Sequence, residues 1–153
     1  MRFLLAHPAH LAAFGFGAGL SPKAPGTVGS LVGLPLYFLI DHLAPATYWA
    51  IVALGLILGV WVCGRTGRAL GVHDHGGIVW DEIVAMLMVL PFAVPTLWGY
   101  ALAFGLFRLF DIWKPFPIGW LDARVKGGLG VMLDDVLAAA YAIVCLLGVA
   151  AWR

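Results

Sequence analysis

Charged side chains are scarce in this chain of 153 residues: only 11% are Asp, Glu, Lys or Arg, whereas 63% are hydrophobic. Soluble domains carry roughly 25% charged residues on average, so this composition, with a mean hydropathy of +0.98, indicates an integral membrane protein. The formal net charge of +1 lacks the clustered basic excess typical of nucleic-acid-binding domains. We therefore expect membrane lipids around the chain and no nucleic-acid partner.

Cysteine is also rare, and no secretory signal is recognisable. Cys63 and Cys145 both lie in apolar runs, where cysteine acts as a small hydrophobic residue, so they indicate neither a disulfide framework nor a redox compartment. His7 and Pro8 interrupt the N-terminal apolar run before it reaches the length of a signal sequence, about 7–15 residues. We expect no cleaved signal and a single domain over residues 1–153. The oligomeric state is left open.

Long apolar segments make up most of the chain. They predict an all-α, polytopic membrane bundle with about four to five membrane-embedded helices, joined by loops or re-entrant segments. Each segment is bounded by breakers or charged residues: 28–41, 47–63, 78–90, 96–110 and 130–152. Residues 78–110 exceed one span of about 20 residues, and Pro91 and Pro95 divide them into two helices. Thr27 is the predicted N-cap of the first helix, because its hydroxyl can accept a free backbone N–H.

The division at the two prolines also gathers the basic residues on one side of the membrane. Seven of them share that side, with Arg153 opposite: Lys23, Arg65, Arg68, Arg108, Lys114, Arg124 and Lys126. The positive-inside rule makes this side cytoplasmic. Nearly all acidic residues fall there too, and Asp41 is the exception. We therefore expect a multi-pass protein with its functional site on the cytoplasmic face.

Five acidic residues stand within or at the ends of apolar segments: Asp81, Glu82, Asp111, Asp134 and Asp135. A carboxylate is costly at membrane depth unless it faces a partner, a metal ion or a wet cavity. We predict that these acids gather at one membrane face and hold a divalent metal ion. The alternative is that they only mark helix starts, where the helix dipole favours acidic side chains.

Asp111 is expected at the C-terminal end of a helix, where an acid opposes the helix dipole. Pro115 disfavours a helical conformation for Lys114, so the helix should stop near these residues. Asp111 is then either a metal ligand or the ordinary ion-pair partner of Arg108 or Lys114. These residues alone do not decide between the two interpretations.

Two glycine-rich stretches, 14–19 and 26–30, flank Lys23. The second leads into a helix N-terminus, where free N–H groups and the dipole attract anions, so it is a candidate phosphate cradle. A glycine-rich hinge that packs closely on other helices is the alternative. The loop residues 73–75, His-Asp-His, form a second-rank candidate for metal binding, since lone loop histidines are more often simple polar residues.

Two other function classes fit the sequence less well. Membrane CDP-alcohol phosphotransferases come close, because Asp122–Arg124 and Gly130–Asp134 echo their motif, but that motif needs Asp where Ala138 stands. A small ion or solute transporter would use the acids as a pathway and needs polar groups in the far halves of the spans. Only Asp41 and His42 are found there, in a loop.

Several sequence blocks occur in order along nearly the whole chain: His10-Leu11, Gly15–Ser30, Ile78–Glu82, Phe110–Pro115 and Gly127–Asp135. In these blocks the chain resembles the phosphatidylglycerophosphatase A family. Each block alone is modest, but together they are highly specific.

The resemblance implies a magnesium-dependent enzyme of the bacterial inner membrane that hydrolyses phosphatidylglycerophosphate to phosphatidylglycerol and phosphate. Mg²⁺ prefers oxygen ligands and keeps several waters, which suits a site of carboxylates. We expect catalytic roles for Asp81, Asp111, Lys114 and Asp135, metal ligation by Asp81, Glu82, Asp111, Asp134 and Asp135, and substrate contacts from Lys23, Thr27, Ser30 and His73. Direct attack by water and an aspartyl-phosphate route both stay open.

Overall fold

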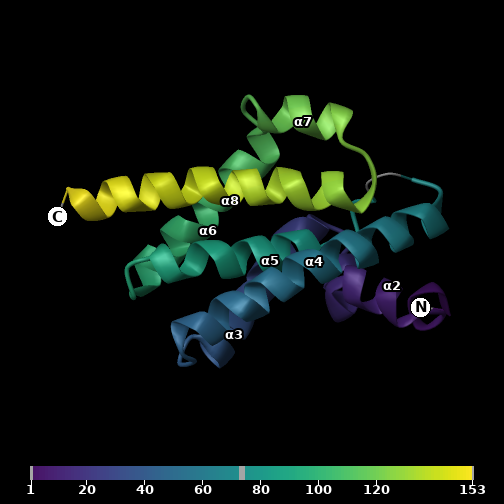
Figure 1. The fold of residues 1–153 in the computed structure, drawn as a ribbon, viewed down its shortest axis with the longest axis horizontal. Helices are drawn as coiled ribbons and strands as arrows, with labels where there is room; N and C mark the ends of the chain where they lie inside the picture. Colours follow the sequence, from purple (N-terminus) through teal and green to yellow (C-terminus); the bar gives the residue numbers. More distant parts are fainter. Residues whose placement is uncertain (1, 73–74, 153) are drawn as a thin grey trace.

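The computed structural model describes residues 2–72 and 75–152, and within these ranges it contains helices and no strand (Figure 1). The predicted all-α class is therefore confirmed. The elements in chain order are α1 (Arg2–Leu5), α2 (Pro8–Ala13), η1 (Gly15–Leu20), α3 (Pro25–Ile40), α4 (Pro45–Leu70), α5 (Trp80–Val89), η2 (Leu90–Phe92), α6 (Leu97–Trp113), α7 (Ile118–Arg124) and α8 (Gly127–Ala151).

Two of these helices, α4 and α8, are long and apolar enough to cross a membrane. They have 26 and 25 residues. At a rise of about 1.5 Å per residue, each exceeds the roughly 30 Å hydrocarbon core of a bilayer. Helix α3 is apolar but has 16 residues, and α5 has only 10. By length and composition, the described part of the chain contains two candidate spans, and the expected four to five are not confirmed.

Large apolar side chains cover much of the outer surface. Helix α4 exposes seven of them: Trp49, Ile51, Leu54, Ile57, Leu58, Val60 and Trp61. Soluble monomers rarely expose contiguous apolar patches larger than a few hundred Å². This surface suits lipid better than water, in keeping with membrane association.

The predicted break within residues 78–110 is confirmed. Helix α5 ends at Val89, Pro91 lies in the short helix η2, and α6 begins at Leu97. Thr96 caps the start of α6, because its Oγ1 accepts a hydrogen bond of 3.0 Å from the backbone N–H of Gly99. The sequence therefore located this break correctly, on the ground that proline cannot continue a helical hydrogen-bond ladder.

Two predicted helix boundaries in the N-terminal half of the chain are wrong. Thr27 is not an N-cap, because α3 begins at Pro25, whose fixed φ suits a first helical position. The cap residue is Ala24, in a left-handed conformation and without a side-chain hydrogen bond. Helix α4 does not end near Cys63 but continues to Leu70, where Gly71 adopts the left-handed conformation common at helix C-termini.

The helices alternate in direction, so the molecule has two chemically different ends. At one, here called the aromatic end, α3 and α5 finish and α4 and α6 start. Ring contacts join them there through Tyr37, Tyr48, Trp49, Phe92 and Tyr100. At the other, the polar end, α3, α5 and α8 start and α4 and α6 finish. Figure 1 shows α4, α5 and α8 running along the long axis of the molecule between these ends.

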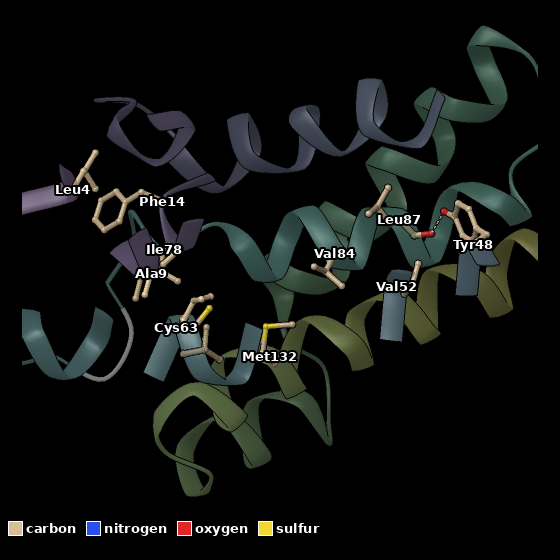
Figure 2. Packing of buried hydrophobic residues seen from close by; sticks show 13 residues of the cluster. Leu4, Ala9, Phe14, Tyr48, Val52, Cys63, Ile78, Val84, Leu87 and Met132 are labelled. Carbon is tan, nitrogen blue, oxygen red and sulfur yellow. Dashed lines mark hydrogen bonds between the residues drawn. The ribbon is translucent and has the colours of Figure 1, made fainter. Parts of the chain in front are cut away.

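Helix α5 lies at the centre of the bundle, between two clusters of buried apolar residues. Its residues Val84 and Leu87 belong to the cluster shared with α1, α2, α4 and α8, part of which Figure 2 shows. Met86 and Val89 belong to the second cluster, shared with α6 and α8. In Figure 2 the hydroxyl of Tyr48 on α4 donates a hydrogen bond to the Leu87 carbonyl at 2.5 Å. This hydrogen bond fixes the C-terminal part of α5, and packing on both sides holds the helix in the interior with its first turn at the polar end.

Candidate active site

Three carboxyl groups from two helices meet at the polar end. Asp81 and Glu82 lie in the first turn of α5, and Asp135 lies in α8. One carboxylate oxygen from each falls within 4.8 Å of the other two. Asp81 is only 7% exposed and Asp135 only 3% exposed, although both are ionisable. We call Asp81, Glu82 and Asp135 the acid cluster.

Asp135 lies deeper in its helix than the sequence suggested. Because α8 begins at Gly127 rather than near Gly130, Asp134 and Asp135 are about two turns inside it. They are enclosed by protein, so the alternative that they only mark a helix start does not describe their surroundings.

The acid cluster has the properties of a cation site. Three buried oxygens have no hydrogen-bond partner among the described residues: Asp81 Oδ1, Glu82 Oε2 and Asp135 Oδ2. Buried carboxylates this close repel one another and lose hydration, so they need a cation or bound protons to persist. An all-oxygen set of this kind suits a hard divalent ion such as Mg²⁺. The residues therefore fit the metal that the family resemblance implies.

Arg108 on α6 lies beside the acid cluster. Its Nη1 is 2.5 Å from Asp111 Oδ2 and 3.8 Å from Glu82 Oε1, and it donates a hydrogen bond of 3.5 Å to Ser30 Oγ. Its Nε is buried and has no partner in the described chain. From the sequence, Arg108 is expected only as one of the basic residues of the cytoplasmic side and as a possible partner of Asp111. The i,i+3 spacing of Arg108 and Asp111 was the available signal for this pair.

Asp111 thus pairs with Arg108 rather than with Lys114. It also lies close enough to Glu82 and Asp135 for their charges to interact. Both interpretations left open for Asp111 are compatible with this position, because a carboxylate has two oxygens and only one binds the guanidinium.

The first turn of α3 closes one side of the site. A Cβ at Gly26 would collide with Glu82 Oε1 and lie 3.2 Å from Arg108 Nη1, so a larger residue here would displace these two side chains. Ser30 is fully buried and its hydroxyl donates a hydrogen bond of 2.8 Å to the Gly26 carbonyl. Thr27 is half-buried in the same turn. The glycine-rich stretch 26–30 therefore both packs closely on the neighbouring helices and borders the acids.

Lys114 and Asp134 form a separate ion pair next to the acid cluster. Lys114 Nζ donates to Asp134 Oδ2 at 2.6 Å and to Asp122 Oδ2 at 3.0 Å. Burial by itself would lower the pKa of Lys114, but the hydrogen bonds and charges of Asp134 and Asp122 raise this pKa above its ordinary value. Asp134 Oδ1 also accepts the Asp135 backbone N–H at 3.1 Å. Of the five predicted ligands, Asp134 is the one whose carboxylate is directed to a lysine.

The remaining predicted site residues are Lys23 and His73, and Lys23 makes no ion pair with the acid cluster. Lys23 is exposed in the loop before α3 and forms no ion pair within the described ranges. His73 and Asp74 lie outside the described residues. His75, the third residue of that loop candidate, accepts a hydrogen bond of 3.0 Å from the Gly77 N–H through Nδ1.

Comparison with known proteins identifies the relatives of this chain. The family model described as phosphatidylglycerophosphatase A matches residues 11–150. A relative named phosphatidylglycerophosphatase A from Escherichia coli (strain K12) is 48% identical over 139 residues, which are 90% of this chain and 80% of the relative. One of the same name from Haemophilus influenzae is 48% identical over 154 residues, covering 99% and 94%.

A third relative carries a different name. The protein from Bacteroides thetaiotaomicron named "Putative phosphatidylinositol-3-phosphatase" is 41% identical over 147 residues, which cover 90% of each chain. No solved structure matches the chain significantly. The matched region of all three relatives and of the family model covers nearly the whole chain, including the acid cluster.

Proposed function

The chain belongs to the phosphatidylglycerophosphatase A family, and from this premise we propose that the acid cluster and Arg108 form its catalytic centre. The chain is a lipid phosphatase that hydrolyses phosphatidylglycerophosphate to phosphatidylglycerol and phosphate. The observation that carries the proposed location is the meeting of three carboxyl groups: one oxygen of each lies within 4.8 Å of the other two, and each group has a buried oxygen without a hydrogen-bond partner among the described residues. This reading is favoured over the phosphotransferase and transporter alternatives, because the family match spans residues 11–150.

Mg²⁺ is the proposed cofactor. Asp81, Glu82 and Asp135 would hold it, with Asp111 near enough to complete the carboxylate set. When bound, the ion would offset phosphate charge and lower the pKa of a water molecule. We no longer assign Asp134 to the ion, because its carboxylate binds Lys114 at 2.6 Å and accepts the Asp135 N–H.

Arg108 is proposed to bind the phosphate of the substrate. A guanidinium offers several N–H donors in a planar fork that matches phosphate oxygens. Its Nε is buried and unpartnered in the described chain, so one donor is free for a ligand. The charges of Glu82 and Asp111 and the Ser30 hydroxyl hold the group in place through its Nη1. Because phosphoryl transfer depends mainly on positioning and electrostatics, a fixed cation of this kind favours the reaction.

Lys114 is proposed as a positioning residue and not as a direct phosphate ligand. Its ammonium group is already shared between Asp134 and Asp122. The Lys114–Asp134 pair ties the end of α6 to α8 and so fixes Asp135, the next residue, against the first turn of α5. Thr27 and Ser30 in the first turn of α3 are proposed to border the phosphate, while Lys23 would meet the headgroup from outside.

We also propose a location for the protein. The polar end would face the cytoplasm in the bacterial inner membrane, and the chain would cross the bilayer several times. The basic residues of the polar end support this, because positive charge is enriched on cytoplasmic loops. A substrate headgroup at the membrane surface could then reach the acids without leaving the bilayer plane.

The experiment that tests this function is phosphate release by the purified protein. Phosphatidylglycerophosphate with Mg²⁺ should yield phosphate, and EDTA should abolish the reaction. Phosphatidic acid and phosphatidylinositol 3-phosphate, included in the same panel, measure how selective the site is. Absence of release from all three lipids would refute the lipid phosphatase function, and undiminished release in EDTA would refute the metal.

Substitution of the acids tests the site itself. Asp81→Asn and Asp135→Asn should each lower turnover by at least about 100-fold, because loss of a charged ligand weakens both the ion and its orientation. Asp41→Asn is the matched control, since Asp41 is an exposed residue at the aromatic end. Near-normal rates for both cluster variants would show that the centre lies elsewhere.

A further inference from the structure

An apolar groove of about 370 Å³ separates α3 from α6. Its walls include Leu31, Leu34 and Phe38 on α3 and Tyr100, Ala101 and Phe104 on α6. Almost no polar surface lines it. Two helices that packed tightly would have no such space between them, so the gap needs an explanation.

The groove ends beside the candidate active site. On α3, Leu31 follows Ser30, and on α6, Phe104 precedes Arg108 by about one turn. The hydrogen bond of 3.5 Å between Arg108 and Ser30 closes its inner end. A ring contact of 5.1 Å between Phe38 and Tyr100 joins its two walls toward the outer end, where Leu97 also lines it. From Ser30 to Phe38 it runs about 12 Å along α3, from the polar end toward the aromatic end.

Two other directions from the site are filled or polar. Between α5 and α8 the space is occupied by fully buried core residues, among them Met86, Ala138 and Ala139. Toward α7 lie the charged groups of Lys114 and Asp122. An alkyl chain attached to a phosphate at the acid cluster has no room on the first side and no apolar surface on the second.

A second apolar groove, of about 310 Å³, lies between α3, α4 and α5 but is cut off from the site. The seam between α3 and α5 is closed by contacts at two glycines. A Cβ at Gly29 would come within 2.6 Å of Val79, and a Cβ at Gly33 within 2.6 Å of Met86. The backbone of α3 therefore rests directly on α5 and separates Glu82 from this groove.

We propose that the groove between α3 and α6 holds an acyl chain of the lipid phosphate substrate while the phosphate lies at the acid cluster and Arg108. The inference rests on the proposed lipid phosphatase function and adds how the lipid enters and is oriented. Lipid tails are as apolar as the groove walls, so the chain gains little affinity by leaving the bilayer. Its gain is orientation, which holds the phosphate at the reacting groups.

Two neighbouring substitutions on α6 test the groove. Ala101→Trp places a large ring in it, whereas Leu102→Trp adds the same ring at an exposed position outside its walls. With bilayer-forming, long-chain phosphatidylglycerophosphate, Ala101→Trp should lower kcat by about tenfold or more and Leu102→Trp should not. With a water-soluble, short-chain analogue, both variants should match the unsubstituted protein. Wild-type turnover of the long-chain lipid by Ala101→Trp would refute the proposal that the groove holds an acyl chain.

Photolabelling of the unsubstituted protein decides the question even if Ala101→Trp prevents folding. A lipid phosphate with a photoactivatable group midway along one acyl chain should label Leu31, Leu34, Tyr100 or Ala101. Unlabelled phosphatidylglycerophosphate should suppress this labelling, and phosphatidylcholine should not. Competed labels on Ile51, Leu54 or Leu58 of the second groove would overturn the proposal. The phosphate-release assay of the unsubstituted protein is independent of this result. No release from any lipid would refute the lipid phosphatase function. Release without competed labels in the groove would refute only the proposed acyl-chain site.

Discussion

At the scale of single residues, the candidate site is a balance of buried charges. Three carboxylates of the acid cluster and Asp111 stand near one guanidinium, that of Arg108. A buried charge persists when opposite charges and hydrogen bonds surround it, and its removal leaves the partners unpaired. Arg108 is therefore both a candidate phosphate ligand and a support for Asp111 and Glu82, and a test must separate these roles.

Arg108→Gln should lower turnover by about 100-fold, comparable to the loss of one well-placed donor to transition-state charge. The turnover of Arg108→Lys should fall between those of Arg108→Gln and the unsubstituted protein, because lysine keeps the charge but not the planar fork. The measurement is kcat and KM for phosphate release, beside the thermal midpoint of each variant in detergent. Arg124→Gln is the matched control, since Arg124 is exposed on α7 and stacks on Trp120 at 4.1 Å. If both variants keep the wild-type thermal midpoint and Arg108→Lys is as inactive as Arg108→Gln, the planar guanidinium is required and the charge alone does not suffice. Full activity of Arg108→Gln would refute the assignment of Arg108 as a phosphate ligand.

At the scale of the elements, the site depends on how helix ends are joined. Helix α6 ends at Trp113, and Lys114 follows in a left-handed conformation with φ of 45°. From this position its side chain crosses to α8 and binds Asp134. The pair holds the end of α6 against the second turn of α8, next to Asp135. Since Asp134 is almost fully buried, it depends on this partner.

Lys114→Met should destabilise the protein by about 1–3 kcal/mol, because it leaves the Asp134 carboxylate buried without its cation. The double substitution Lys114→Met with Asp134→Leu should recover part of that loss, since it removes both charges. The free energy of unfolding in detergent, measured with denaturant or heat for the two single variants and the double variant, completes this double-mutant cycle. Equal and additive losses from the two single changes would show that the pair does not act as a unit.

The pH dependence of this pair has a defined sign. The folded pKa of Lys114 lies above the ordinary lysine value of about 10.4. The stabilisation is therefore fully present at neutral pH, and it is lost only as the pH rises through the higher folded value. Any loss of stability of the unsubstituted protein as the pH rises from 7 to 9 must therefore come from groups other than Lys114.

At the scale of the whole molecule, the two ends differ in chemistry. The polar end carries the acid cluster and its surrounding charges, and the aromatic end carries rings of tyrosine, tryptophan and phenylalanine. Aromatic side chains are enriched at membrane interfaces, and basic loops are enriched on the cytoplasmic side. The proposed orientation follows from this difference.

Cysteine labelling in intact cells tests that orientation. In a Cys145→Ala background, where Cys63 is buried, His42→Cys at the aromatic end should react with a membrane-impermeant maleimide added outside. Arg124→Cys at the polar end should react only after the membrane is permeabilised. Labelling of both positions from the same side would exclude the proposed topology.

The sequence by itself determined the helical class, the break at Pro91 and Pro95, and the family, through blocks that follow one another along the chain. These features depend on local composition and order, which a linear reading contains. The sequence also predicted that the acids lie at one end of the bundle, because successive helices alternate in direction. It misplaced the starts of α3 and α8 and the end of α4, because cap conformations at Ala24 and Gly71 depend on surrounding contacts.

Only the tertiary structure decided which acids meet. Neighbouring helical residues point about 100° apart, so Asp134 and Asp135 must face different partners, but periodicity does not say which. Packing of α8 against α5 and α6 directs Asp135 to Asp81 and Glu82, and Asp134 to Lys114. The same packing brings Arg108 to the acids from a helix that is distant in sequence. Convergence of this kind is set by contacts between helices, and no single segment of sequence encodes it.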